Sequence, residues 1–206
     1  MTNMERKNLG LIYDPSDKEI MDMQIGSLSA MEKFNATTSA EPELRQKLLK
    51  EMLGACGENC WIEPPFHANW GGKNLFFGNN VYANFNLTAV DDVEIIVGNN
   101  VMFAPNCTLT TANHPLDPTL RGKAYQYAKK IVIEDNVWLG SNVVVLPGVT
   151  IGKNSVIGAG AVVTKNIPAN VLAMGIPCRV VSEIGEEDKK YFDHGKKIDY
   201  ENLTIE

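Results

Sequence analysis

Aliphatic residues recur at every sixth position through much of the second half of this chain. The clearest run keeps one register through Ile133, Leu139, Val145, Ile151, Ile157 and Val163. Glycine often follows the aliphatic residue directly, as at Gly140, Gly152 and Gly158. A single strand alternates with a period of two, and a long helix would not tolerate so many glycines. The period of six therefore predicts a β-solenoid, in which each hexad supplies one short strand and one corner.

The six-residue spacing continues upstream, with one interruption. It places apolar residues, with a slip of two positions midway, at Phe77, Ala83, Ala89, Val97, Phe103 and Leu109. The pattern then stops until Ile131, because residues 110–130 contain prolines and polar clusters instead of hexads. A loop this long inside a compact repeat is usually functional. We therefore expect a protruding loop over residues 110–130, and this loop contains His114.

The ends of the chain differ in pattern from the repeat. Leucine and methionine residues in 43–53 lie three to four positions apart, with Pro42 suited to a first turn and Gly54 to a stop, which predicts a helix. A second helix is expected over residues 18–34, after a turn at 14–17. Residues 171–206 are expected to form a capping strand and a polar helical tail. The sequence thus predicts a mainly β protein with a helical segment over 1–58, a solenoid over 59–184 and a tail over 185–206.

Composition and charge narrow the classes of function. Apolar residues make up 44% and charged residues 21%, which is typical of a soluble globular protein. The net charge of −6 argues against a nucleic-acid partner, which would require a basic face. The sequence has no membrane-spanning apolar run and no secretory signal, so we expect a cytoplasmic location and no membrane partner. The four cysteines lack the spacing of a zinc site, so we interpret them as free thiols and expect no metal.

Several motifs resemble those of the hexapeptide-repeat acetyltransferases, and within them the maltose and galactoside O-acetyltransferases. They lie at residues 82–86, 112–115, 136–141, 158–165 and 175–179, and the segment Tyr13–Asp14–Pro15 resembles the helical region of the sugar-acetylating branch. The resemblance implies a left-handed triangular β-helix with three hexads per coil. It also implies acetyl-CoA as co-substrate, a sugar hydroxyl as acceptor, and a homotrimer with sites between subunits.

The resemblance also assigns site residues. His114 is expected to be the general base, since an imidazole is largely neutral near pH 7 and can take a proton from an attacking hydroxyl. Attack is expected to be direct, without an acyl-enzyme. The implied sugar contacts are Asp14, Asn84, Asp92, Tyr82 and Asn69. The implied coenzyme contacts are Ser141, Ala159, Thr164, Lys165 and Arg179. Where the galactoside branch has a methionine that contacts the acceptor, this chain has Gln126.

Three other functions fit this sequence less well. A metal-dependent solenoid enzyme of the γ-carbonic anhydrase type would need three convergent histidines, and His67, His114 and His194 lie far apart in the sequence. A non-catalytic binding solenoid would not need a long loop carrying a histidine. A drug-modifying acetyltransferase on the same fold remains the alternative within the enzyme class, although the N-terminal helical segment favours sugars. Aspartates at corners, such as Asp14 and Asp92, also commonly form turns.

Overall fold

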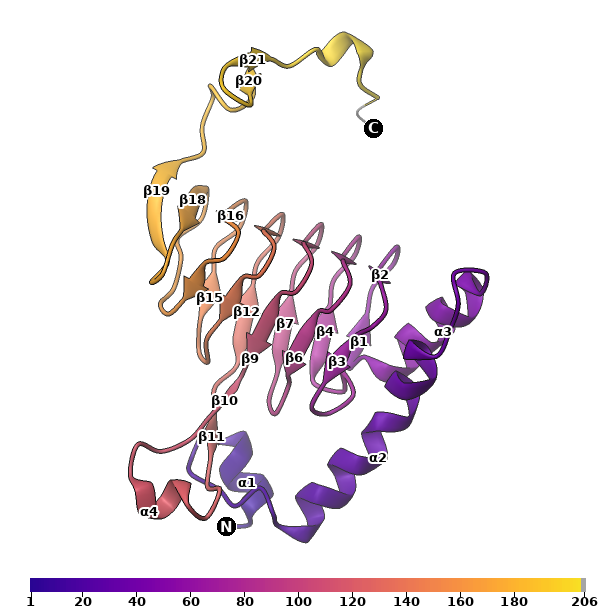
Figure 1. Cartoon of the computed structure of the whole chain (residues 1–206), viewed down its shortest axis with the longest axis vertical. Coiled ribbons are helices and arrows are strands. Elements are labelled where there is room, and N and C mark those ends of the chain that lie inside the picture. The colour runs from indigo at the N-terminus through magenta and orange to yellow at the C-terminus, as the bar shows by residue number, and fades with distance from the viewer. Residues whose placement is uncertain (205–206) are drawn as a thin grey trace.

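The computed structural model describes residues 1–204, and its centre is a stack of short parallel strands (Figure 1). Sheet I contains β1 (Ala55–Cys56), β4 (Leu75–Phe77), β7 (Ile95–Val97), β12 (Ile131–Ile133) and β15 (Thr150–Ile151). Sheet II contains β2 (Trp61–Ile62), β5 (Tyr82–Ala83), β8 (Met102–Phe103), β13 (Trp138–Leu139), β16 (Val156–Ile157) and β18 (Val171–Met174). Sheet III contains β3 (His67–Ala68), β6 (Thr88–Val90), β9 (Thr108–Thr110), β14 (Val144–Val145) and β17 (Val162–Val163). The chain passes through sheets I, II and III in turn, so three hexads make one coil and the predicted β-solenoid is confirmed.

The core of the solenoid consists of the residues that the six-residue period selects. All six aliphatic residues of the run from Ile133 to Val163 are 0% exposed. The position four places further is also buried, from Val137 to Ala161. Ser155 is the polar member of that second set, and its hydroxyl is satisfied because it donates to the carbonyl oxygen of Pro168 at 2.8 Å. Each hexad therefore contributes two side chains to the interior, and the strands can be short because their neighbours above and below complete the hydrogen bonding.

One corner of the solenoid, between sheets I and II, is built by a column of asparagines. Their φ angles lie between +55° and +60°, a region that asparagine tolerates better than most residues. Each side-chain amide donates to the amide oxygen of the asparagine one coil further along, at 2.7–3.1 Å. We call this column, which runs through Asn59, Asn80, Asn100, Asn136, Asn154 and Asn170, the asparagine ladder.

Three helices precede the solenoid. α1 (Asn3–Asn8), which the sequence analysis did not predict, begins with a capping box between Thr2 and Glu5. α2 (Lys18–Asn35) and α3 (Pro42–Met52) agree closely with the predicted helices, and α3 packs against β1 and β2 of the first coil (Figure 1). β1 already pairs with β4, so strand pairing starts four residues before the predicted boundary at residue 59. Within residues 1–204, no helix has the length and apolar character needed to cross a membrane.

The predicted loop over 110–130 forms a projecting arm between β9 and β12. β10 (Ala112–Asn113) and β11 (Tyr127–Ala128) pair antiparallel, and α4 (Pro118–Arg121) lies at the tip. We call residues 112–128 the arm. In Figure 1 it leaves the stack on the side where α1 lies, and α1 contacts β11.

The C-terminal region closes the far end of the stack. β18 pairs parallel with β16, and β19 (Arg179–Glu183) pairs antiparallel with β18. The predicted helical tail is wrong: β20 (Tyr191–Phe192) and β21 (Lys196–Lys197) form a hairpin, followed by a 3₁₀ turn at Tyr200–Asn202. The reason is the turn between the two strands, where His194 and Gly195 have φ angles of +59° and +86°, which no α-helix contains.

Candidate active site

His114 lies on the arm directly after β10, and its side chain is exposed. Its Nδ1 is 2.8 Å from the carbonyl oxygen of Tyr125 on the opposite side of the arm. Because a carbonyl oxygen can only accept, this hydrogen bond places the proton of the neutral ring on Nδ1. Nε2 then carries the lone pair and can take a proton from a substrate hydroxyl. The structure therefore gives His114 the tautomer that a general base requires.

A hydrogen-bonded cluster lies at the base of the arm. Asp92 follows β6 and is 3% exposed, and its Oδ1 accepts from Nε2 of Gln126 at 3.0 Å and from the hydroxyl of Tyr13 at 3.3 Å. Its Oδ2 accepts from Nδ2 of Asn69 at 3.1 Å. Nε2 of Gln126 also donates to the hydroxyl of Tyr13. We call Tyr13, Asn69, Asp92 and Gln126 the arm-base cluster. The cluster contains two predicted sugar contacts, Asn69 and Asp92, but their side chains are hydrogen-bonded to each other.

Charged groups lie beside this cluster. Asp91 is 0% exposed and accepts the N–H of Trp70 at 2.7 Å, and burial raises the pKa of its carboxyl to about 6. Lys7, on α1, is 4% exposed and its ammonium lies 4.1 Å from the centre of the Trp70 ring. Burial lowers the pKa of Lys7, while the charges of Asp92 and Asp91 oppose that shift. Asp91 and Lys7 were not among the predicted site residues, because the burial that shifts their pKa values arises only in the folded chain.

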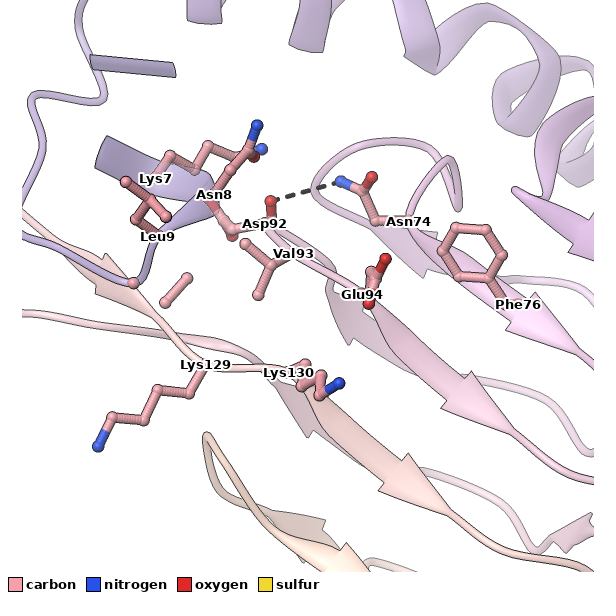
Figure 2. A pocket seen from close by; sticks show the side chains of 12 residues that line it. Lys7, Asn8, Leu9, Asn74, Phe76, Asp92, Val93, Glu94, Lys129 and Lys130 are labelled. Carbon is pink, nitrogen blue, oxygen red and sulfur yellow. Dashed lines mark hydrogen bonds between the residues drawn. The ribbon is translucent and has the colours of Figure 1, made fainter. Parts of the chain in front are cut away.

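A hollow of about 680 Å³ opens next to the arm-base cluster, and Figure 2 shows the side chains that line it. It lies between α1, the corner after β6 and the residues that lead from β11 into β12. Asp92 and Asn74 line it, and Nδ2 of Asn74 donates to the carbonyl oxygen of Asp92 at 3.4 Å. His114 does not line this hollow.

The predicted coenzyme contacts lie on other corners of the solenoid. Ser141 and Ala159 occupy equivalent places in successive coils, at the corner between sheets II and III, where Gly160 N–H donates to the carbonyl oxygen of Ser141 at 2.8 Å. Their own backbone N–H groups have no hydrogen-bond partner within residues 1–204. Asn84 lies at the same corner two coils earlier and is half-buried. The corner between sheets II and III therefore carries these two N–H donors and, two coils before Ser141, the side-chain amide of Asn84.

The remaining predicted residues are spread over the surface. Thr164 and Lys165 follow β17 and are exposed, and Arg179 begins β19 and is also exposed. Tyr82 is 38% exposed on the outer face of sheet II. Asp14 forms a turn, since its Oδ1 accepts from the N–H and the hydroxyl of Ser16 at 2.9 and 2.6 Å.

Within one chain, His114 on the arm lies in a different part of the fold from the corner between sheets II and III that carries Asn84 and Ser141. Within residues 1–204, no hydrogen bond links His114 to the predicted sugar contact Asn84 or to any of the predicted coenzyme contacts. The structure also identifies two groups that the sequence analysis did not assign, the carbonyl of Tyr125 and the side chain of Tyr13. A main-chain carbonyl leaves no mark on the sequence, because any residue can supply it. In the described residues, no three His, Cys, Asp or Glu side chains lie close enough together to hold a metal ion.

Family models match both parts of the chain. The bacterial transferase hexapeptide model, of six repeats, matches residues 130–165, within the solenoid. The maltose acetyltransferase hexapeptide capping motif matches residues 8–57, which hold α2, α3 and β1.

Known proteins match over almost the whole chain. A galactoside O-acetyltransferase of Lactococcus lactis is 57% identical, and the match covers 93% of each chain. A galactoside O-acetyltransferase of Escherichia coli is 45% identical over 97% of this chain and 98% of its own. A solved structure of a galactoside acetyltransferase in complex with coenzyme A superposes with a TM-score of 0.94 at 45% identity, covering 97% of this chain and 99% of that one. A maltose O-acetyltransferase from Clostridium difficile superposes with a TM-score of 0.87 at 39% identity, covering 90% and 99%. The parallel β-helix, the helical cap and these likenesses together show that the chain belongs to the hexapeptide-repeat acetyltransferases, in the family of the galactoside and maltose O-acetyltransferases.

Proposed function

We propose that this protein transfers an acetyl group from acetyl-CoA to a hydroxyl of a sugar or glycoside of the galactoside or maltose type. The observation that carries the proposal is the hydrogen bond from His114 Nδ1 to the Tyr125 carbonyl, which leaves Nε2 as a proton acceptor on an exposed arm. Two relatives at 45% and 57% identity are galactoside O-acetyltransferases, which supports the same chemistry and acceptor class here.

In the proposed reaction, Nε2 of His114 takes the proton of the sugar hydroxyl while the oxygen attacks the thioester carbon. Such help from a general base is worth roughly 10²–10⁴ in rate. The attack forms the new ester bond directly, the thiolate leaves, and the proton held on His114 passes to it. Sugar hydroxyls are proposed to bind Asn84 and Asp14, with Tyr82, Asn69 and Asp92 as further predicted contacts.

The residues proposed to bind the coenzyme fit its chemistry. The N–H groups of Ser141 and Ala159 have no partner within residues 1–204, so they can donate to a carbonyl or amide oxygen of the coenzyme. Lys165 and Arg179 are exposed cations near the same end of the stack, and Thr164 adds a hydroxyl. Cations and free donors in one region suit the phosphates and amides of acetyl-CoA.

We also propose a homotrimer, since apolar side chains form a row on the outer face of sheet II. Tyr82, Met102 and Trp138 come from successive coils and are 38%, 50% and 47% exposed. Phe85, 46% exposed, lies at the edge of the same sheet. A contiguous apolar row of this kind is typical of a surface that another chain covers. In a ring of three copies, the arm of one subunit would carry His114 to the Asn84 corner of the next.

Light scattering at micromolar concentration tests the assembly: three chains are expected, and a monomer would contradict the proposal. Mixed trimers test the shared site. When inactive His114→Ala and Asn84→Ala chains are refolded together at equal ratio, about one quarter of the sites should regain both side chains if neighbouring subunits supply them. A trimer without recovered activity would place both residues in one chain.

The acceptor is tested by a panel of galactosides, glucosides, maltose and aminated antibiotics with acetyl-CoA, followed by release of free thiol. We expect turnover with saccharides. Turnover with the aminated drugs alone would instead support a xenobiotic acetyltransferase. The proposal includes a cytoplasmic location, which fractionation of the producing cells tests.

A further inference from the structure

The peptide group that orients His114 is itself held by the N-terminal segment. The Tyr125 carbonyl that accepts from Nδ1 belongs to the same peptide group as the N–H of Gln126. That N–H donates to the carbonyl oxygen of Tyr13 at 3.1 Å, and the N–H of Tyr13 donates to the carbonyl oxygen of Gln126 at 2.9 Å. Because a peptide group is planar, fixing its N–H also fixes the direction of its carbonyl. The position of Tyr13 therefore sets the direction from which His114 is held.

This contact begins where the pairing within the arm ends. β10 and β11 pair only through Ala112 with Ala128 and Asn113 with Tyr127. His114 is the next residue after that pairing on one side, and Gln126 is the next on the other. The bridge between Tyr13 and Gln126 therefore continues the hydrogen bonding at the point where the pairing of β10 with β11 stops.

Side chains lock this bridge to the solenoid. The two hydrogens of Gln126 Nε2 are directed to Asp92 Oδ1 at 3.0 Å and to the hydroxyl of Tyr13. Tyr13 is 0% exposed, and burial, together with the charge of Asp92, raises its pKa, so its hydroxyl stays protonated and donates to Asp92. A hydrogen bond to a carboxylate is stronger than one between neutral groups. A methionine at position 126 could make neither bond, because its side chain has no hydrogen-bond donor of this kind.

We propose that Tyr13 and Gln126 are positioning residues for the catalytic base. The hydrogen bonds between Tyr13 and Gln126 hold the arm in place, so that His114 keeps its proton on Nδ1 and presents Nε2 to the acceptor. The inference rests on the proposed function, in which His114 is the base. It adds that Tyr13 and Gln126 contribute to the rate through His114, because they hold the peptide group whose carbonyl orients the imidazole.

Two substitutions remove the side-chain lock and leave the backbone intact. Tyr13→Phe removes one hydroxyl, and Gln126→Leu removes the amide at similar volume. Small misplacements of a catalytic group can cost up to about 100-fold, so we expect kcat to fall roughly 10- to 100-fold in the double variant. The KM for acetyl-CoA should stay within about twofold, because neither residue is a predicted coenzyme contact. Tyr127→Phe, on the neighbouring position of β11, is the matched control and should keep wild-type kcat.

The second readout is the tautomer of His114, which a merely structural role would not change. Protein labelled with ¹⁵N-histidine has three imidazoles, and the His114→Ala spectrum identifies the missing one. Wild-type protein should show His114 with its proton on Nδ1. The double variant should show a mixture of both tautomers.

Unchanged kcat and tautomer in folded variants would overturn the inference, and so would a lower kcat with an unchanged tautomer. If Gln126→Leu does not fold, the more conservative Tyr13→Phe decides alone. The two proposals can fail separately. If His114→Ala keeps full turnover, the proposed base is wrong. If His114→Ala is inactive while the Tyr13→Phe and Gln126→Leu variants behave as wild type, only the positioning role of Tyr13 and Gln126 is wrong.

Discussion

The asparagine ladder offers a quantitative test of what holds the coils together. Asn136 donates to Asn154 Oδ1 at 2.9 Å and accepts from Asn100 Nδ2 at 3.0 Å. Asn136→Gly keeps access to the φ of +59° but removes both bonds. A net hydrogen bond is worth about 0.5–1.5 kcal/mol, so the loss should be about 2 kcal/mol. Asn136→Ala loses the same bonds and adds about 1 kcal/mol for a left-handed residue with a Cβ.

The first asparagine of the ladder is the matched control. Asn59 has φ +56° and only one ladder bond, to Asn80 at 3.1 Å. In a chain of this size, 1 kcal/mol shifts Tm by about 2–4 °C, so Asn136→Gly should lower Tm by about 4–8 °C and Asn59→Gly by about half as much. Differential scanning calorimetry measures both. Equal Tm values for Asn136→Gly and Asn136→Ala, or equal effects at the two positions, would refute this reasoning.

Two further predictions follow from the buried charge and from coil packing. The pKa of the Asp91 carboxyl is about 6 in the folded protein against 3.8 ordinarily, so the folded state favours the protonated carboxyl. The stability that this preference contributes is fully present below pH 4 and is lost as the pH rises through 6. Between pH 7.5 and pH 5 the unfolding free energy should therefore rise by about 1.4 kcal/mol more in wild type than in Asp91→Asn, and equal pH slopes would contradict this. In Gly140→Ala, the new Cβ would lie 2.7 Å from the backbone N of Ala159, so the coils must separate at the proposed coenzyme corner. The KM of Gly140→Ala for acetyl-CoA should therefore rise roughly 10-fold, and an unchanged KM would show that this corner does not bind the coenzyme. The control is Gly26→Ala, where nothing lies near the new Cβ; it should keep the wild-type KM and gain up to about 1 kcal/mol in stability.

The sequence predicted the solenoid in detail because each coil repeats the same packing requirement. A residue such as Leu139 faces an equivalent residue above and below, so one register determines the whole core. The helices α2 and α3 were predicted for a similar reason, since their caps and apolar spacing are local features. The tail was predicted incorrectly because its charges resemble a helix, whereas the turn at His194 and Gly195 decides its structure.

The site was less predictable than the fold. His114 stood out because it lies in the long loop, but its orientation depends on a main-chain carbonyl that any residue could provide. The arm-base cluster joins Tyr13, Asp92 and Gln126, which are separated by 34 to 113 positions in the chain. Only folding brings such distant residues together. Within one chain, the corner that carries Asn84 and Ser141 lies apart from His114. In the proposed trimer, the arm of a neighbouring subunit brings His114 to this corner and completes the site.

The central claim is that Nε2 of His114 takes the acceptor's proton. The most direct test is the kcat of His114→Ala with a saccharide acceptor, together with acetyl-CoA affinity measured by calorimetry. We expect kcat to fall by roughly 10²–10⁴ while acetyl-CoA binds with nearly unchanged affinity, because the base acts in the transition state. A folded His114→Ala protein that turns over at the wild-type rate would contradict it.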